Sequence, residues 1–138
     1  MFYINKKETR LIILQRIELI GSFLKKIRKI FGRYIFSSFI SKYFLSTTDV
    51  GKAYFENMHQ EFESINSGID LLNKNLLSIG GGLGGLELFI NTKINIKSFT
   101  FIERNYISKK VKYGWDNNNN EAYNDLGIQK KFLIKNGM

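Results

Sequence analysis

The chain has 138 residues, the length of one small domain, and its composition of 43% hydrophobic and 24% charged residues is globular rather than disordered. It contains no cysteine and one histidine, His59, which excludes disulfides, thiolate metal sites and histidine metal clusters. The net charge is +9, and most of it lies in residues 1–33, where nine Lys or Arg accompany two Glu.

Residues 8–31 have the spacing of an amphipathic helix. Apolar residues recur there at alternating spacings of three and four, which places them on one face. Two interpretations stay open: a helix packed on the core, or a peripheral contact with an anionic membrane surface through basic residues off that face. These are Lys25, Lys26, Arg28 and Lys29. No segment is long and apolar enough to be transmembrane and none resembles a signal peptide, so a cytoplasmic location is expected.

Two further helices are predicted before the first strand. The apolar and aromatic residues 31–45 predict a helix after a break near Gly32. Residues 46–49, Ser-Thr-Thr-Asp, are typical of a helix start, which predicts a helix from Val50 to Ile65 followed by a turn at Asn66–Gly68.

The rest of the chain predicts a strand, a helix, a second strand and a last helix. Asn75–Ile79 is a short apolar run that stops at glycine, and Ile96–Ile102 is β-branched and aromatic. A helix beginning near Gly84 would join them, which implies parallel strands and a right-handed crossover. The segment 117–120 is a polar loop. The final helix is predicted over Glu121–Asn136, with three candidate buried positions, Leu126, Phe132 and Leu133.

The central motif is the glycine loop at residues 80–85, Gly-Gly-Gly-Leu-Gly-Gly. A glycine loop between strand and helix lets the backbone approach a ligand closely, and the helix N-terminus offers free N–H groups. Glu103 ends the second strand, where a carboxylate can accept hydrogen bonds from the ribose hydroxyls of an adenosine cofactor. The alternative is a tight turn without a ligand, with Glu103 in solvent.

The glycines alone leave two cofactor classes open. Gly80, Gly82 and Gly85 satisfy the dinucleotide pattern, which favours an NAD-binding Rossmann module. Gly80, Gly82 and Gly84 satisfy the pattern of S-adenosylmethionine enzymes.

Wider context resembles the second class. Leu76–Gly85 resembles motif I of the class I S-adenosylmethionine-dependent methyltransferases, and Phe99–Asn105 resembles their second motif. Gly51–Phe62 and residues 113–116, Tyr-Gly-Trp-Asp, are similar to segments of sugar O-methyltransferases. The resemblance implies an α/β protein with an incomplete Rossmann-like methyltransferase fold, its β-α-β cofactor half preceded by N-terminal helices. Residues 1–45 would form a basic, aromatic helical region and 46–138 a partial S-adenosylmethionine-binding domain.

The same resemblance implies the cofactor contacts. The methionine part of S-adenosylmethionine would lie against Gly80, Gly81, Gly82 and Gly84, the ribose on Glu103, and the adenine near Arg104 and Asn105. A small-molecule or glycan hydroxyl would be the acceptor. Motif I of the family carries an acid two residues before its first glycine, whereas this chain has Ser78.

Two interpretations of His59 stay open: a catalytic base, because a histidine ring can take up a proton near neutral pH, or a half-exposed surface histidine without a catalytic role. It lies on the helix before motif I, where it would face the cofactor cleft, with Tyr54 on the same face. Glu56 and Glu61, on that helix, are expected in solvent.

The chain ends at Met138, about where the family's third strand is due. The resemblance therefore implies an N-terminal piece or a shortened descendant of a methyltransferase. Two parallel strands leave edges and apolar faces uncovered, so a partner chain completing the sheet is expected. The side chains expected to be poorly covered are Phe99, Phe101, Phe132 and Leu133.

A third hypothesis is a non-enzymatic remnant that acts through a partner chain or a membrane. Nucleic-acid binding is not expected, because no stacking platform or recognition motif accompanies the basic residues.

Overall fold

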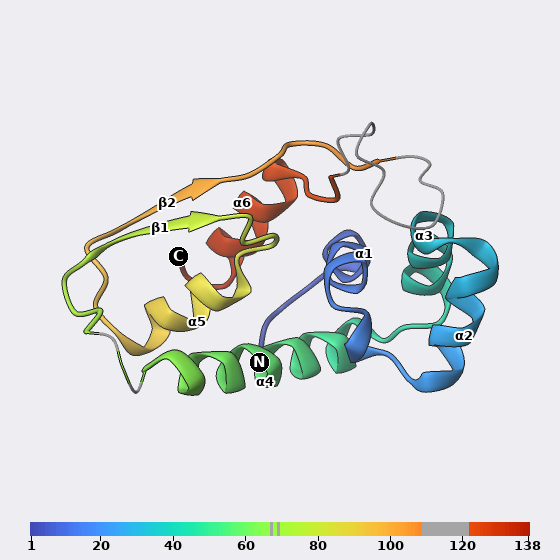
Figure 1. The fold of residues 1–138 in the computed structure, drawn as a ribbon, viewed down its shortest axis with the longest axis horizontal. Coiled ribbons are helices and arrows are strands. Elements are labelled where there is room, and N and C mark those ends of the chain that lie inside the picture. The colour runs from blue at the N-terminus through green and yellow to red at the C-terminus, as the bar shows by residue number, and fades with distance from the viewer. Residues whose placement is uncertain (67, 69, 109–121) are drawn as a thin grey trace.

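The computed structural model describes residues 1–66, 68, 70–108 and 122–138, which form an α/β fold with a two-stranded parallel sheet (Figure 1). The resemblance at 113–116 and the loop predicted at 117–120 lie outside these residues. The sheet forms the outermost layer, α5 and α6 lie beneath it, and α4 lies beneath them (Figure 1). The elements are α1 (Lys6–Gln15), η1 (Ile17–Leu19, a 3₁₀ turn), α2 (Ser22–Phe31), α3 (Arg33–Tyr43), α4 (Thr47–Asn66), β1 (Asn75–Ile79), α5 (Gly85–Lys93), β2 (Ser98–Ile102) and α6 (Leu126–Lys135).

The N-terminal segment is not the single helix predicted over residues 8–31. It is divided into α1, η1 and α2. The Asn5 side chain accepts hydrogen bonds from the backbone of Lys7 and Glu8, and the Glu8 carboxylate accepts one from the Asn5 backbone, which fixes the start of α1. Four successive residues of α1, Leu11–Leu14, are buried, so this helix is enclosed rather than amphipathic. The first half of the segment predicted to touch a membrane therefore belongs to the core.

The next two helices follow the sequence prediction closely. Gly32, with a φ of 74°, ends α2 and precedes α3, as the predicted break required. The α4 helix begins at Thr47, three residues before the predicted start, because the Ser46 hydroxyl accepts a hydrogen bond from the Asp49 backbone at 3.2 Å. Within the described residues, no helix is both long and apolar enough to cross a bilayer.

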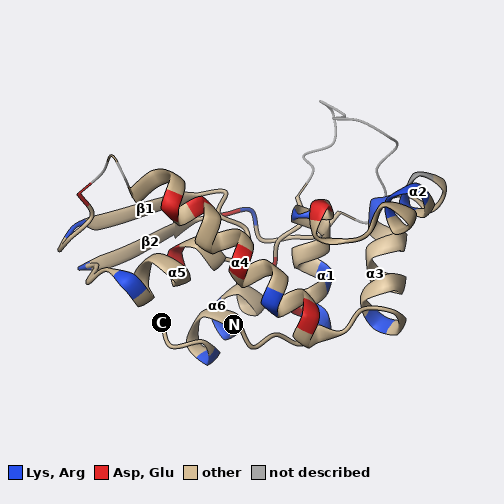
Figure 2. Cartoon of the chain, turned by 90° about the horizontal axis from the view of Figure 1, so that it is seen from below, with Lys and Arg blue, Asp and Glu red and all other residues tan. Residues whose placement is uncertain are grey.

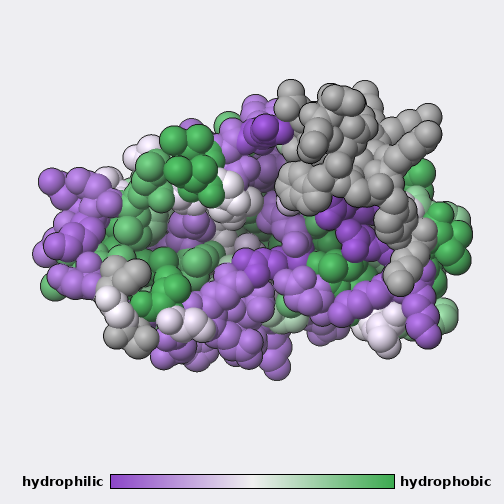
Figure 3. Space-filling view, viewed as in Figure 1, coloured by the Kyte–Doolittle hydropathy of each residue, from purple (hydrophilic) through white to green (hydrophobic). Residues whose placement is uncertain are grey.

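The predicted parallel pair of strands is confirmed. β1 has the predicted bounds, β2 begins two residues later than predicted, and Leu76 pairs with Phe99 in a parallel register. Alternation along both strands divides the side chains between two faces. Phe99 and Phe101 point to the inner face and are half-buried. The outer face is bare, and Figure 3 shows hydrophobic atoms exposed over the strands. Its exposed apolar residues are Leu77, Ile79 and Ile102.

Two of the four side chains expected to be poorly covered, Phe132 and Leu133 on α6, are covered, and for them the expectation is wrong. Phe132 has an exposed fraction of 0% and Leu133 is also buried, whereas Leu126, predicted to be buried, is exposed. The N-terminal segment supplies the cover: the Phe2 ring lies 5.5 Å from the Phe132 ring, centroid to centroid. The Lys135 ammonium lies 2.6 Å from the buried carboxylate of Glu8, which ties α6 to α1. One buried apolar cluster thus draws on both predicted regions, 1–45 and 46–138.

Candidate cofactor site

A cavity of about 750 Å³ opens at the carboxyl ends of β1 and β2. Ligands of open parallel sheets bind in this position, beyond the ends of the strands. Five of the predicted site residues line this cavity together: Gly80, Gly81, Gly82, Glu103 and Arg104. The structure therefore brings the glycine loop and the acid 21 residues after Gly82 to one place.

The glycine loop has the backbone that its sequence predicts. Gly80, Gly82 and Gly84 have φ angles of 70°, 64° and 83°, in the left-handed region that favours glycine. The same three glycines are the ones that satisfy the sequence pattern of S-adenosylmethionine enzymes. Gly84 lies outside the cavity, directly before α5, where an added Cβ would lie 3.1 Å from Leu133. Its role in the structure is to let α5 begin close to α6.

Glu103 holds the glycine loop. Its carboxylate accepts a hydrogen bond from the Gly82 backbone N–H at 2.8 Å. The Gly82 carbonyl in turn accepts hydrogen bonds from two buried amides, Asn124 at 2.8 Å and Gln129 at 2.7 Å. The backbone of Leu83 donates to the side chain of Gln15 at 3.2 Å. Several loop groups that a ligand would contact are therefore already positioned by the protein's own side chains.

A carboxylate from α5 lies next to Ser78, the position at which the chain has a serine instead of an acid. Glu87, in the first turn of α5, accepts a hydrogen bond from the Ser78 hydroxyl. Both side chains approach Gly81 so closely that an added Cβ there would overlap them. The acid absent from β1 is thus matched by one from the following helix, nine residues later.

A paired charge forms the side of the cavity opposite the strands. The Arg16 guanidinium makes a two-pronged ion pair with Glu61, whose second nitrogen–oxygen distance is 3.0 Å, and it donates to Asn57 at 3.3 Å. Glu61 was expected in solvent, and its side chain is instead half-buried, because Arg16 from the end of α1 holds the carboxylate in the cavity wall.

Tyr54 from α4 lies between this pair and the glycine loop. Its ring lies so close to Gly85 that a Cβ there would overlap it. Burial raises the pKa of the Tyr54 phenol well above its ordinary value, and the opposing effects of the Arg16 charge and a hydrogen bond from the Gly85 backbone are smaller. The phenol therefore stays protonated at neutral pH.

This burial predicts a pH dependence of stability. Above about pH 10 the unfolded chain releases the Tyr54 proton while the folded chain keeps it, so the free energy of unfolding falls as pH rises. Tyr54→Phe removes this contribution. We expect urea denaturation at about pH 8 and about pH 11 to show this. Between the two pH values, the free energy of unfolding of the variant should rise relative to that of the wild type by about 1 kcal/mol. A difference between the two proteins that is the same at both pH values would contradict the buried phenol.

His59 lies away from the cavity. Its ring stacks on Phe89 with the centroids 5.3 Å apart, and its Nε2 atom lies 3.4 Å from a Glu63 carboxylate oxygen. The face of α4 that meets the cavity carries Tyr54 and Met58 instead. The structure thus does not bring the predicted base together with the glycine loop.

Three buried polar atoms around the cavity have no hydrogen-bond partner among the described residues. They belong to side chains that line it: Gln15 Nε2, Glu87 Oε2 and Asn124 Oδ1. Buried polar groups in proteins are almost always hydrogen-bonded, so each such atom needs an explanation. The three atoms are one donor and two acceptors, and all three belong to residues of the cavity wall.

Sequence reasoning missed most of the residues that shape this site. Gln15 with Arg16, Glu87 and Asn124 come from three separate places in the chain, and none of them belongs to the motifs. Only Glu87 had a usable signal, as an acid in the first turn of the helix after the loop. Comparisons of the chain with protein-family models, with curated proteins and with solved structures give no match.

Proposed function

We propose that this chain binds S-adenosylmethionine at the cavity beside the glycine loop and is a methyltransferase-like protein. The observation that carries the proposal is the meeting of the left-handed glycine loop and Glu103 at one cavity beyond two parallel strands. The Glu103 carboxylate would keep the Gly82 N–H on one oxygen and accept hydrogen bonds from the ribose hydroxyls on the other. The sugar hydroxyl as acceptor follows from the resemblance of Gly51–Phe62 to sugar O-methyltransferases.

The charges of the cavity favour S-adenosylmethionine over a dinucleotide. Three carboxylates line it, those of Glu61, Glu87 and Glu103, together with the guanidinium groups of Arg16 and Arg104. Arg16 is paired with Glu61, so the lining keeps an excess of one negative charge, which suits the positive sulfonium and amino groups of this cofactor. A pyrophosphate would require free N–H groups at the loop, but Gly82 and Leu83 already donate to side chains, one of them the negative Glu103. An NAD-binding module is therefore the weaker alternative.

Glu87 would replace the acid that motif I lacks here. Its Oε2 atom is buried without a partner among the described residues, while Oε1 is held by Ser78. A protonated amine on the ligand would give that oxygen the hydrogen bond it lacks. The missing acid at position 78 is thus compatible with cofactor binding.

Titration calorimetry of the full chain tests the proposal. S-adenosylmethionine and its demethylated product, S-adenosylhomocysteine, should both release heat with a stoichiometry near one, whereas NAD should not. Heat with NAD alone would favour the dehydrogenase module. No heat with any of the three would contradict cofactor binding altogether.

The bare outer face of the sheet favours a second candidate function, pairing with another chain. Leu77, Ile79 and Ile102 are each more than half exposed, and the two-stranded sheet leaves the outer edge of each strand without a neighbouring described strand. In this role the chain would be a non-enzymatic partner that completes its sheet on another protein. Light scattering after gel filtration would support it if the chain associates and Leu77→Lys restores the monomer, because Leu77 lies outside the cofactor cavity.

A further inference from the structure

The α2–α3 hairpin presents a large exposed apolar surface. It lies at the end of the molecule farthest from the sheet, where Figure 3 shows hydrophobic atoms at the rim. On α3, the Phe39 ring packs against two other exposed rings, with centroids 5.3 Å from Tyr43 and 5.4 Å from Phe44. The exposed apolar residues of the hairpin are Phe23, Ile30, Phe31, Ile35, Phe39, Tyr43 and Phe44. Exposed apolar patches on this scale mark interaction sites.

The same hairpin is strongly and exclusively basic. The sequence between Glu18 and Asp49 contains six Lys or Arg and no acidic residue. Figure 2 shows the basic residues of α2 grouped at this end of the molecule. Lys26 and Lys42 are exposed, and the Lys42 ammonium lies 5.0 Å from the centroid of the Tyr43 ring. Aromatic and aliphatic side chains are therefore interleaved with cations.

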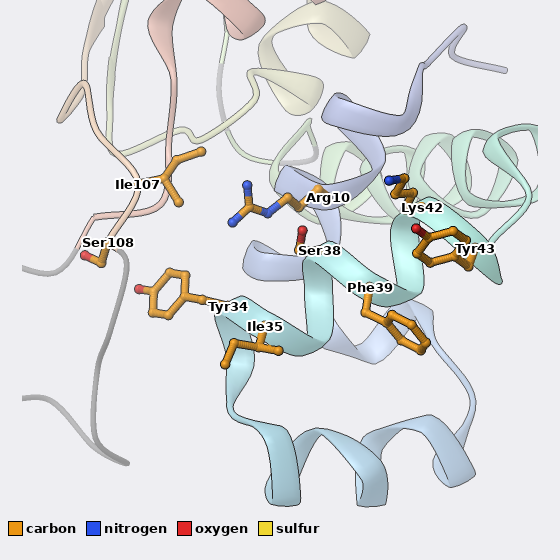
Figure 4. A pocket seen from close by; sticks show the side chains of 9 residues that line it. All are labelled: Arg10, Tyr34, Ile35, Ser38, Phe39, Lys42, Tyr43, Ile107 and Ser108. Carbon is orange, nitrogen blue, oxygen red and sulfur yellow. The ribbon is translucent and has the colours of Figure 1, made fainter.

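A groove beside α3 adds a second cationic feature. It is lined by Arg10 and Lys42, by the hydroxyl-bearing Ser38 and by Phe39, with no acid among its described lining residues. Figure 4 shows Arg10, Ser38 and Lys42 above the α3 ribbon and Phe39 below it. The Arg10 Nε atom is buried and has no partner among the described residues.

We propose that the α2–α3 hairpin docks on the anionic surface of a lipid bilayer. The exposed aromatic and aliphatic side chains would enter the boundary between headgroups and acyl chains, while the lysines of the hairpin meet lipid phosphates. Two features of the hairpin favour this occupant. A second copy docked face to face would bring two acid-free basic surfaces together, which repel. Nucleic acid would leave the exposed aliphatic residues Ile30 and Ile35 without a stacking role.

Vesicle co-sedimentation of the full chain tests this proposal. Vesicles of phosphatidylcholine with about one third phosphatidylserine should bind the chain, and vesicles of phosphatidylcholine alone should bind it far less. The double variant Lys25→Glu, Lys26→Glu should weaken binding at least about 20-fold, and Phe39→Ser should weaken it independently of charge. The matched controls are Lys52→Glu with Lys97→Glu, exposed lysines elsewhere, and Leu72→Ser, an exposed apolar residue before β1. Both controls should bind as the wild type does.

Four outcomes would overturn the proposal. The first is equal binding to charged and uncharged vesicles, and the second is equal weakening by the hairpin and control variants. The third is a chain that self-associates through Phe39, and the fourth is a chain that prefers single-stranded RNA to anionic vesicles at the same salt concentration. Circular dichroism shows whether each variant is folded, so that a loss of binding can be distinguished from a loss of structure. Loss of binding here is independent of the cofactor cavity, which shares no residue with the hairpin.

Discussion

Phe132→Ala is expected to lower the free energy of unfolding by about 3–5 kcal/mol. The Phe132 ring is fully buried and lies among the rings of Phe2 and Tyr54, at centroid distances of 5.5 and 6.4 Å. Its removal leaves a cavity where α4, α6 and the N-terminal segment meet, and none of the three can close it without losing its other contacts.

Urea denaturation followed by circular dichroism measures this loss. Ile134→Ala, two residues later on the same helix and 60% exposed, is the matched control and should cost less than about 1 kcal/mol. Equal and small losses for both variants would mean that α6 is only loosely attached. That result would mean that the inner face of the sheet is poorly covered after all.

Glu103→Ala is expected to weaken the binding of S-adenosylhomocysteine by about 10- to 100-fold, because hydrogen bonds to a charged acceptor contribute about 1.5–3 kcal/mol. The variant also releases the Gly82 backbone N–H, which the carboxylate accepts at 2.8 Å. This second loss should lower the free energy of unfolding by about 1 kcal/mol, leaving the fold intact.

Calorimetry of matched variants separates the two effects of Glu103. Glu103→Gln keeps an acceptor for Gly82 but loses the charge, so it should restore stability more than it restores affinity. Glu56→Ala, an exposed acid on α4 outside the cavity, should leave both unchanged. If the wild type binds the cofactor and Glu103→Ala binds it equally well, the ligand occupies another site.

The elements with strong local signals were predictable from the sequence. The run Asn75–Ile79 is apolar and stops at glycine, and β1 has the same bounds. Ser46 precedes a helix because its hydroxyl can bind a free backbone N–H, and α4 begins beside it. The glycine loop has positive φ at three positions, a backbone conformation that glycine adopts without steric cost. Each of these depends on residues within one turn or one strand.

Helical periodicity was a poorer guide over residues 8–31. An uninterrupted apolar stripe on one face predicted one helix, but Leu11–Leu14 are all buried because α3, α4 and α6 surround α1. Periodicity reports which side chains share a face, and it does not report how many neighbours a helix will have. The break after Gln15 places that residue at the loop, where its side chain bonds Leu83, 68 residues away.

The sequence by itself determined the strand, loop, helix and strand of residues 75–103, together with the acid that follows them, because these are set by local backbone preferences. Only the tertiary structure decided what surrounds the loop. It brought Arg16 to Glu61, Glu87 to Ser78 and Asn124 to Gly82, left His59 on Phe89, and covered Phe132 with Phe2. Such pairings depend on which helix faces pack together, and many join residues far apart in the chain, so no local pattern encodes them.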